Sequence, residues 1–431
     1  SYAGYMHITH PEVEEFLDIR KPTGGDINRK CTNLHHGIVI NDAFMETIHR
    51  ATKEENFDDS WELIDPHTQQ VKKVVSARTL WVKLLQNRME TGEPYLMFED
   101  AVNQDLPDFQ KKKGLYVNHS NLCSEITLAT NEERTAVCCL SSVNLEYFDE
   151  WSKVPAFIPD LVRMLDNVLQ YFIDNAPEQM EKAKYSALRE RSIGLGAMGF
   201  HAYLQRNSIP FESIMASSKN YEMFKHIKGD ALDETRKLAV ERGACPDDDS
   251  CEVRNAHLLA IAPNASSSII CGNTSPSIEP FRANAFTQKT KSGSYLQKNY
   301  YLNQLLESKG ENSESVWRDI VANKGSVQHL EILTPEEKEV FKTAVEINQA
   351  WVVEHAAQRQ EFVCQSQSVN LFFPPDVTKG DLHNVHMLAW AKNLKTLYYL
   401  RSEAISRADN VSNQVKREVI FEQEDCLACE G

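Results

Sequence analysis

The spacing of apolar positions predicts amphipathic helices with short strands between them. In residues 159–175 an apolar side chain recurs every three or four positions, so one face of a helix should contact the core. This face comprises Leu161, Met164, Leu165, Val168, Leu169 and Phe172. A second helix should begin at Thr334, because Pro335 and Glu337 supply a first-turn proline and a capping box, and it should run to about Val363.

Three short apolar runs, residues 37–40, 366–373 and 394–400, are typical of strands. The alternation of helices with such strands favours an α/β fold class. No repeat or low-complexity linker divides the chain, so we expect one main domain over residues 1–405. Residues 406–431 are rich in Asp, Glu, Asn and Gln, which predicts a flexible tail.

The composition narrows the class of protein. A chain of 431 residues, 42% hydrophobic and 25% charged, can bury a large core. Its 62 acidic and 46 basic residues give a net charge of −16, which argues against nucleic acid or a membrane surface as the main partner. The chain contains no apolar run of membrane-spanning length and does not open on a signal-peptide pattern, so we expect a cytoplasmic protein. Its ten scattered cysteines are typical of a reducing compartment.

Gly194, Gly196 and Gly199 match the G-x-G-x-x-G spacing of a dinucleotide-binding turn. The residues before them, 187–191, are charged and helix-like instead of forming an apolar strand, and no acidic ribose partner follows about 20 residues later. We therefore reject dinucleotide binding and expect these glycines to permit close packing of backbone in a barrel.

Asn121, Cys123 and Glu125 alternate along one short segment. In extended backbone, alternate side chains point the same way, so the three would form one site. An amide, a thiol and a carboxylate could supply a hydrogen-bonding group, a one-electron or nucleophilic sulfur and a general base. Taken alone, the pattern is more typical of a polar loop.

Three further segments could take part in chemistry, although each also has an ordinary structural interpretation. Cys138 and Cys139 lie in an apolar run, which by itself indicates a buried strand. Residues 263–268 place a proline before small hydroxyl side chains, which could bind a phosphate at a helix start or form a serine-rich turn. Tyr398 and Tyr399 are adjacent in an apolar run, which alone indicates packing.

Cys426 and Cys429 form a Cys-x-x-Cys pair in the expected tail. On a mobile, exposed segment such a pair is suited to thiol–disulfide exchange, because exposure and a neighbouring thiol control which sulfur attacks. A zinc site would need a second Cys or His pair at ligand spacing, and none is evident nearby. We therefore favour redox exchange over a metal site. The alternative that the two cysteines have no chemical role stays open.

Six segments, taken together and in order, resemble the large subunit of class I ribonucleotide reductases, and the match extends over nearly the whole chain. They are NLCSE, AVCCLSSVNL, ERSIGLGAMG, APNASSSIICGNTSPSIEPF and AWAKNLKTLYYLRSEA, followed by the C-terminal cysteine pair. Six ordered segments are far more specific than any single motif. The resemblance implies an oxidoreductase that makes deoxyribonucleotides from ribonucleoside diphosphates by radical chemistry.

The resemblance also implies roles for the reacting residues. Cys123 matches the cysteine that becomes a thiyl radical and abstracts the ribose 3′ hydrogen. Glu125 matches the general base on the 3′ hydroxyl, and Asn121 matches the residue that holds the departing 2′ hydroxyl. Cys138, and not Cys139, falls on the position of a reducing cysteine.

The remaining implied roles concern radical transfer, substrate binding and turnover. Tyr399 and then Tyr398 resemble the pair that passes the radical from a metal-containing small subunit, so the chain itself would bind no metal or cofactor. Residues at the positions that bind the substrate diphosphate are Asn264, Ala265, Ser266 and Ser267. Cys426 and Cys429 resemble the tail thiols that re-reduce the site and are themselves reduced by thioredoxin or glutaredoxin.

The implied fold is a ten-stranded α/β barrel with Cys123 on a loop through its middle, where a radical is kept from water and side reactions. Large subunits of this family carry their first barrel strands, allosteric sites and second reducing cysteine in N-terminal segments that we cannot find here. We therefore expect the N-terminal strands to be missing and a separate N-terminal large-subunit polypeptide to supply them. Cys139 is a poor second thiol, because neighbouring side chains on a strand point to opposite faces.

The main alternative is a non-catalytic fragment that binds the small subunit or a partner chain. A scaffold would need neither the Asn121 to Glu125 segment nor Cys138, the paired tyrosines or the tail dithiol, so their presence argues against it. A cobalamin-dependent or glycyl-radical relative is also disfavoured. The paired tyrosines indicate a separate radical-bearing subunit, and the chain contains no C-terminal glycyl-radical segment.

Overall fold

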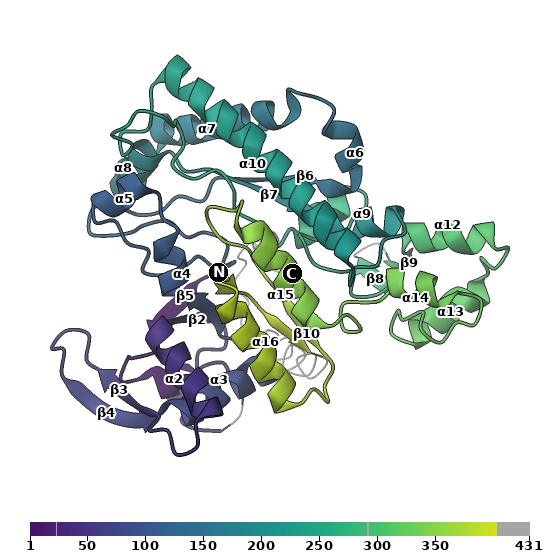
Figure 1. Ribbon diagram of the computed structural model, residues 1–431, viewed down its shortest axis with the longest axis horizontal. Coiled ribbons are helices and arrows are strands. Elements are labelled where there is room, and N and C mark those ends of the chain that lie inside the picture. Colours follow the sequence, from purple (N-terminus) through teal and green to yellow (C-terminus); the bar gives the residue numbers. More distant parts are fainter. Residues whose placement is uncertain (23, 291–292, 403–431) are drawn as a thin grey trace.

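The computed structural model describes residues 1–22, 24–290 and 293–402 (Figure 1). The predicted tail, with Cys426 and Cys429, lies outside the described residues. Helices and short strands alternate along the described chain, as the α/β prediction requires. Within it, none of the helices combines the length and the apolarity needed to cross a bilayer.

A four-stranded sheet forms around the N-terminal part of the chain. β1 (Ala3–His7), β2 (His35–Ile40) and β5 (Tyr95–Phe98) pair in parallel, and β11 (Thr396–Leu397) joins β5 in the antiparallel sense. The strand predicted at residues 37–40 is therefore confirmed. Its apolar run is buried, as expected for a strand covered on both faces.

A second series of extended segments continues from this sheet. β6 (Leu140–Asn144) and β7 (Gly194–Met198) are parallel. Backbone hydrogen bonds connect β7 to residues 258–261, these to residues 365–369, and the latter to Tyr398, immediately after β11. The two sheets thus belong to one hydrogen-bonded series, which is the arrangement expected of a barrel wall.

Two of the predicted strands are shorter than expected. Only β10 (Leu371–Phe373) forms a regular strand within residues 366–373, and it pairs with β12 (Leu400–Ser402). In residues 394–400, β11 and the start of β12 are separated by Tyr398 and Tyr399. In these segments the Ser366 amide and the side chains of Ser368 and Thr396 bind a loop. The backbone of Tyr398 and Tyr399 still bonds to residues 369 and 371, although the two tyrosines lie outside the regular strands.

Two antiparallel hairpins lie outside this series. β3 (Ser60–Ile64) pairs with β4 (Val71–Ser76), and β8 (Ala285–Thr290) pairs with β9 (Gly293–Lys298). In Figure 1 the first hairpin projects at the lower left, and the second lies beside a small group of helices at the right. That group has its own hydrophobic core around Trp317.

The helix predicted at residues 159–175 is α7 (Phe157–Asn175), which packs against α10 (Ile214–Arg242) in the upper part of Figure 1. The predicted buried face was partly wrong, because Met164 and Val168 are 43% and 52% exposed. The residues of α7 that are buried are Ile158, Val162, Leu165, Asp166, Leu169 and Ile173. Apart from Asp166, which forms a buried ion pair with Arg191, these residues are apolar and lie at helical spacing, so the apolar pattern fits either of two neighbouring faces.

The capping box predicted at Thr334 is present and begins α14 (Pro335–Val340). The prediction of one helix to residue 363 was wrong, since α15 (Gln349–Gln360) is a separate helix. Between them the Ala344 amide donates to a carbonyl outside both helices, and the Asn348 side chain caps α15. These two interactions stop the first helix and start the second.

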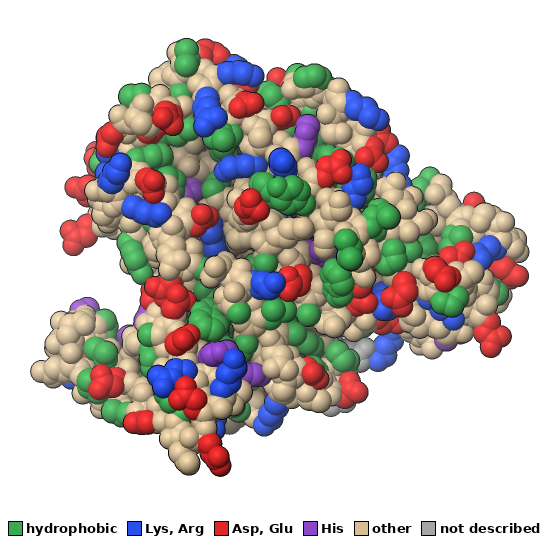
Figure 2. Space-filling model, viewed as in Figure 1, with side chains coloured by type: hydrophobic (Ala, Val, Ile, Leu, Met, Phe, Trp, Pro, Cys, Tyr) green, Lys and Arg blue, Asp and Glu red, His purple; other side chains and the backbone are tan. Residues whose placement is uncertain are grey.

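Smaller helices complete the fold around one main core, with α16 next to α15 in Figure 1. They are α1 (Val13–Phe16), α2 (Asp42–Lys53), α3 (Ala77–Thr91), α4 (Glu99–Gln104), α5 (Asp108–Lys112), α6 (Phe148–Trp151), α8 (Glu181–Glu190), α9 (Phe200–Arg206), α11 (Ala265–Ile270), α12 (Tyr300–Ser308), α13 (Glu314–Ala322) and α16 (Lys379–Ala391). Short 3₁₀ turns span Ile27–Arg29, Leu145–Tyr147 and Glu178–Met180. On the face drawn in Figure 2, acidic and basic side chains are interspersed.

The glycines of β7 are where backbones pack most closely. A Cβ atom on Gly196 would lie 2.5 Å from the backbone oxygen of Ala260, and one on Gly194 would overlap a leucine methyl of β6. Gly199 has a φ of 82° and leaves no room for a Cβ beside Asn144. The expected close packing is confirmed, and the G-x-G-x-x-G spacing serves the barrel wall instead of a dinucleotide.

Gly196→Ala should destabilise the protein by about 1–3 kcal/mol, because the added methyl meets backbone that cannot rotate away. Gly229→Ala is the matched control, since a Cβ there, within α10, meets no atom within 4 Å. The control should instead stabilise the helix by about 0.5–1 kcal/mol. Denaturant unfolding of both variants measures the difference, and equal stabilities would contradict the packing described for β7.

Candidate active site

The segment containing Asn121, Cys123 and Glu125 is a tight turn inside a long irregular stretch. Ser124 has a φ of 65°, in the left-handed region, so the backbone is not extended and the predicted alternation was wrong. The turn nevertheless buries Cys123 and Glu125, and the Asn121 side chain is hydrogen bonded to Glu125. The three predicted site residues therefore lie close together because the chain turns at Ser124, and not because the backbone is extended.

Hydrogen bonds from distant segments of the barrel wall hold this loop by its backbone oxygens. The donors are Tyr5 in β1, Ser366 and Ser368 in the segment before β10, and Thr396 in β11. The Tyr5 hydroxyl donates to the Asn121 oxygen, and the Ser366 amide donates to the Glu125 oxygen. The hydroxyl groups of Ser368 and Thr396 donate to the backbone oxygens of Cys123 and Ser124. The four donor–acceptor distances are 2.5 to 2.9 Å. Because its backbone is bonded to β1, to β11 and to the segment before β10, the loop is held in a fixed position.

Glu125 is a carboxyl group in an apolar, desolvated position. Burial raises its pKa to about 7, and hydrogen bonds from Asn121 and Ser368 offset only part of this rise. Its Oε2 atom is buried and has no hydrogen-bond partner among the described residues. A carboxyl group that titrates near neutral pH can accept a proton from a bound hydroxyl group.

Three tyrosines pack against one another beside Cys123. The ring centroids of Tyr398 and Tyr399 are 4.3 Å apart. The ring centroid of Tyr95 lies 4.7 Å from that of Tyr398 and 5.1 Å from that of Tyr399. Cys123, Tyr95 and Tyr398 belong to one buried cluster, and burial raises the pKa of Tyr398 far above its usual range. The sequence analysis missed Tyr95, because one aromatic residue in an apolar strand carries no signal of its own.

Tyr399 forms the more polar end of this cluster. The guanidinium carbon of Arg401 lies 4.0 Å from its ring centroid, and its hydroxyl oxygen is 3.3 Å from Nδ1 of His35. The same nitrogen is 2.6 Å from Glu93. Burial would raise the pKa of Glu93, but hydrogen bonds from His35 and the adjacent histidine, with a nearby arginine, lower it to about 2. These neighbours of Tyr399 were not identified from the sequence.

The vicinal cysteines occupy different environments. Cys138 is exposed and lies just before β6, whereas Cys139 is buried with its sulfur 3.6 Å from the oxygen of Leu165. Burial raises the pKa of Cys139 to about 11, which makes it a poor nucleophile or reductant at neutral pH. Cys138 is therefore the more available thiol of the two.

Asn264 begins α11 with a φ of 55°, and its side-chain amide donates to the oxygen of Ala197 at the end of β7. Of the two structures left open for this segment, a helix start and a serine-rich turn, the helix start is observed, with Ala265, Ser266 and Ser267 in its first turn. A cavity of about 750 Å³ lies against α11 and reaches the second core. Ala265 and Ser268 line it.

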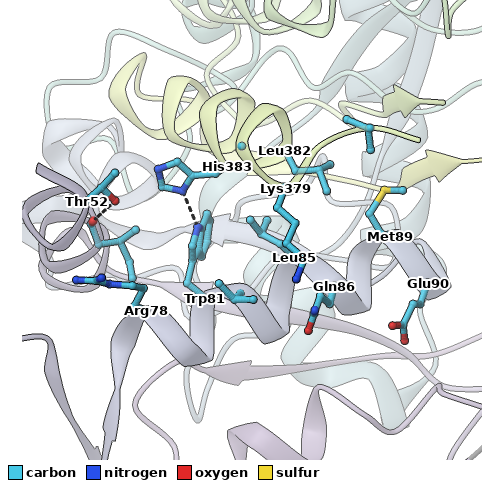
Figure 3. A pocket seen from close by; sticks show the side chains of 14 residues that line it. Thr52, Arg78, Trp81, Leu85, Gln86, Met89, Glu90, Lys379, Leu382 and His383 are labelled. Atoms are coloured by element: carbon cyan, nitrogen blue, oxygen red, sulfur yellow. Dashed lines mark hydrogen bonds between the residues drawn. The ribbon is translucent and has the colours of Figure 1, made fainter. Parts of the chain in front are cut away.

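Another cavity, of about 430 Å³, lies between α3 and α16 (Figure 3). Trp81 donates a hydrogen bond from Nε1 to Nδ1 of His383 across it, and its other walls are largely apolar. It is lined by none of the predicted site residues. Among the described residues, no group of three or more His, Cys, Asp or Glu side chains could hold a metal ion.

Comparisons with known proteins agree with the geometry. A family model described as the barrel domain of ribonucleotide reductase matches residues 1–252 and 248–400. The chain is 48% identical to a putative ribonucleoside-diphosphate reductase large subunit of Frog virus 3 (isolate Goorha), over 100% of this chain and 75% of that protein. It is 44% identical to the ribonucleoside-diphosphate reductase large subunit of Invertebrate iridescent virus 3, over 100% of this chain and 76% of the relative.

A solved structure is similar as well. The alpha subunit of the class Id ribonucleotide reductase of Actinobacillus ureae superposes with a TM-score of 0.82 at 38% identity, covering 94% of this chain and 71% of that one. The predicted family, barrel fold and oxidoreductase activity are confirmed. The chain belongs to the ribonucleotide reductase large-subunit family and is the catalytic subunit of a ribonucleoside-diphosphate reductase.

Proposed function

We propose that this subunit reduces ribonucleoside diphosphates through a thiyl radical on Cys123. The observation that carries the proposal is the burial of Cys123 in one cluster with Tyr398, on a turn that also holds a carboxyl group titrating near pH 7. A one-electron path and a general base thus meet at one sulfur. A purely structural loop would need neither.

The proposed reaction uses each residue of the turn. The Cys123 radical takes the 3′ hydrogen atom of the ribose, and Glu125 takes the proton of the 3′ hydroxyl group. Asn121 holds the 2′ hydroxyl group, which takes a proton from the Cys138 thiol and leaves as water. The hydrogen atom returns from Cys123 to the 3′ carbon at the end of the cycle, so the sulfur radical is regenerated.

The radical reaches Cys123 through Tyr399 and then Tyr398, from a metal-containing small subunit. The 4.3 Å separation of the two rings and the contact of Tyr398 with the Cys123 cluster support this order. Arg401 and His35 surround Tyr399, which is the end that would receive the radical. The order thus leads from a polar entry point to a buried sulfur.

The substrate diphosphate is proposed to bind at the start of α11, through Asn264, Ala265, Ser266 and Ser267. Support comes from their place in its first turn, beside the end of β7 and next to the large cavity. Backbone amides at a helix start can accept a phosphate.

The two electrons for the ribose are proposed to come from Cys138 and a second thiol in N-terminal large-subunit sequence. The buried position of Cys139 supports a partner other than this neighbour. Cys426 and Cys429 would then re-reduce the site and exchange with thioredoxin or glutaredoxin.

Glu125→Gln should lower kcat by about 10²–10⁴-fold, because an amide cannot accept the 3′ hydroxyl proton. In the parent, activity should rise through pH 7 and then level off, since the carboxylate is the active form and the pKa of Glu125 is raised to about 7. Deoxynucleotide formation with the small subunit and reductant present, measured from pH 6 to pH 8.5, tests both points.

The matched control is Glu133→Gln, on an exposed part of the same irregular stretch, which should keep the parent profile. Stability supplies a second control. A carboxyl group with a raised folded-state pKa loses stability as pH rises, so from pH 5 to pH 8 the parent should lose about 2–3 kcal/mol that Glu125→Gln does not lose. A Glu125→Gln protein with parental kcat would contradict the proposal.

A further inference from the structure

Cys364 lies outside the reaction proposed above, yet it sits two residues before the segment that holds the active-site turn. It follows α15 and is partly buried. Ser366 and Ser368, which bind the oxygens of Glu125 and Cys123, come directly after it. A chemical change at Cys364 would therefore occur beside the support of the catalytic loop.

The sulfur of Cys364 accepts two backbone hydrogen bonds. The amide nitrogens of Leu258 and Leu259 donate to Sγ at 3.1 and 3.3 Å. Two adjacent amides directed at one atom form a small anion-binding site. A neutral thiol is a weak acceptor, so the two short amide contacts favour the ionised sulfur. They outweigh the single contact in which a thiol would donate, to the Leu259 oxygen at 3.7 Å.

Basic side chains from three separate segments interact electrostatically with the Cys364 thiol. Lys228 comes from α10, His257 from the segment before residue 258, and Lys395 from the residue before β11. Burial alone would raise the pKa of the Cys364 thiol, but Lys228, His257 and the Leu258 amide lower it well below its usual range. Two acidic groups face these basic side chains: the exposed Asp105, which is bound to Lys395, and the buried Glu190, which interacts electrostatically with His257.

His257 provides independent support. Its ring is 1% exposed, and its Nε2 atom is bonded to the side-chain oxygen of Gln110 at 3.0 Å. Nε2 therefore carries hydrogen, and Nδ1 is the nitrogen left for the sulfur. The buried Nδ1 atom has no other hydrogen-bond partner in the described chain. A thiol next to an otherwise unpartnered imidazole is the arrangement that activates cysteine nucleophiles.

We propose that Cys364 is held as a thiolate and is a site of oxidation by peroxides, separate from the reducing and radical thiols. The thiolate sulfur attacks one oxygen of hydrogen peroxide, so an S–O bond forms and the O–O bond breaks. The sulfur loses two electrons and becomes a sulfenic acid. The proton that the thiol released to the solvent on ionising neutralises the departing hydroxide, so the other peroxide oxygen leaves as water.

The first test measures alkylation by iodoacetamide at each cysteine of the full chain, by peptide mass spectrometry from pH 6 to pH 8. Cys251 is the matched reference, because it is exposed and in the same protein. Labelling of an ordinary thiol rises on the order of 100-fold over this range, as its thiolate fraction does. Labelling of Cys364 should change by less than about threefold, because a thiolate is already formed.

The proposal would be overturned if the labelling rate of Cys364 rose with pH in parallel with that of Cys251. It would also be overturned if Cys364 were not labelled in the folded chain. The variant His257→Gln isolates the cause, since glutamine keeps polarity but cannot act as a base. In that variant, labelling of Cys364 should become steeply pH-dependent. If the labelling of Cys364 stayed independent of pH in this variant, His257 would not be a group that stabilises the thiolate.

The second test treats the full chain with hydrogen peroxide at pH 6.5 and traps sulfenic acid with a 1,3-diketone. Peptide mapping should find the adduct on Cys364 and little on the exposed reference Cys251, because an ordinary thiol reacts slowly with peroxide at this pH. Because the readout is the adduct, it does not depend on turnover or on the roles proposed for Cys123 and Cys138. Equal trapping at Cys364 and Cys251 would contradict the assignment.

Discussion

Cys123→Ser should abolish deoxynucleotide formation while the protein still folds and binds substrate. The hydroxyl group nearly matches the thiol in size, but an O–H bond is too strong for the oxygen to exchange a hydrogen atom reversibly with a ribose carbon. A hydroxyl group in this buried position should cost about 1–3 kcal/mol of stability. The assay requires the small subunit, the reductant and a ribonucleoside diphosphate, with product measured directly.

Cys251→Ser is the matched control, because this cysteine is exposed and belongs to neither the proposed reaction nor the radical path. It should retain parental turnover and stability. Substrate affinity measured for Cys123→Ser separates loss of chemistry from loss of binding. Turnover above background in Cys123→Ser, with all partners present, would show that another group carries the radical.

Tyr398→Phe and Tyr399→Phe should each reduce turnover to background. Phenylalanine keeps the ring and most of the volume, so packing against Tyr95 should survive at a cost below about 1.5 kcal/mol. What is lost is the phenol O–H, the group that is oxidised and re-reduced when a radical passes. The measurement is turnover with the small subunit, alongside unfolding curves of each variant.

The control for this pair is Tyr171→Phe on α7, whose side chain is 71% exposed and far along the chain from the cluster. It should match the parent in every assay. If either Tyr398→Phe or Tyr399→Phe turned over at the parental rate, the ring contacts would be ordinary core packing. A variant that lost both activity and fold would be uninformative, which is why the unfolding curves are measured.

The sequence alone determined the family and the fold class, and it supplied the residues that the proposed reaction uses. Taken singly, the Asn121 to Glu125 segment and the paired tyrosines have ordinary structural explanations, but the order of six such segments along the chain is specific. Local signals also placed the capping box at Thr334 and the strand at residues 37–40. Each of these depends on a few neighbouring residues, and such information is fully present in the chain.

What only the tertiary structure decided depends on contacts between distant segments. The turn at Ser124 and the split between α14 and α15 each involve partners more than twenty residues away. The raised pKa of Glu125 and the lowered pKa of Cys364 likewise come from burial and charges that folding brings together. A local pattern cannot encode these effects, because desolvation and long-range hydrogen bonds exist only once the barrel wall has closed around the loop.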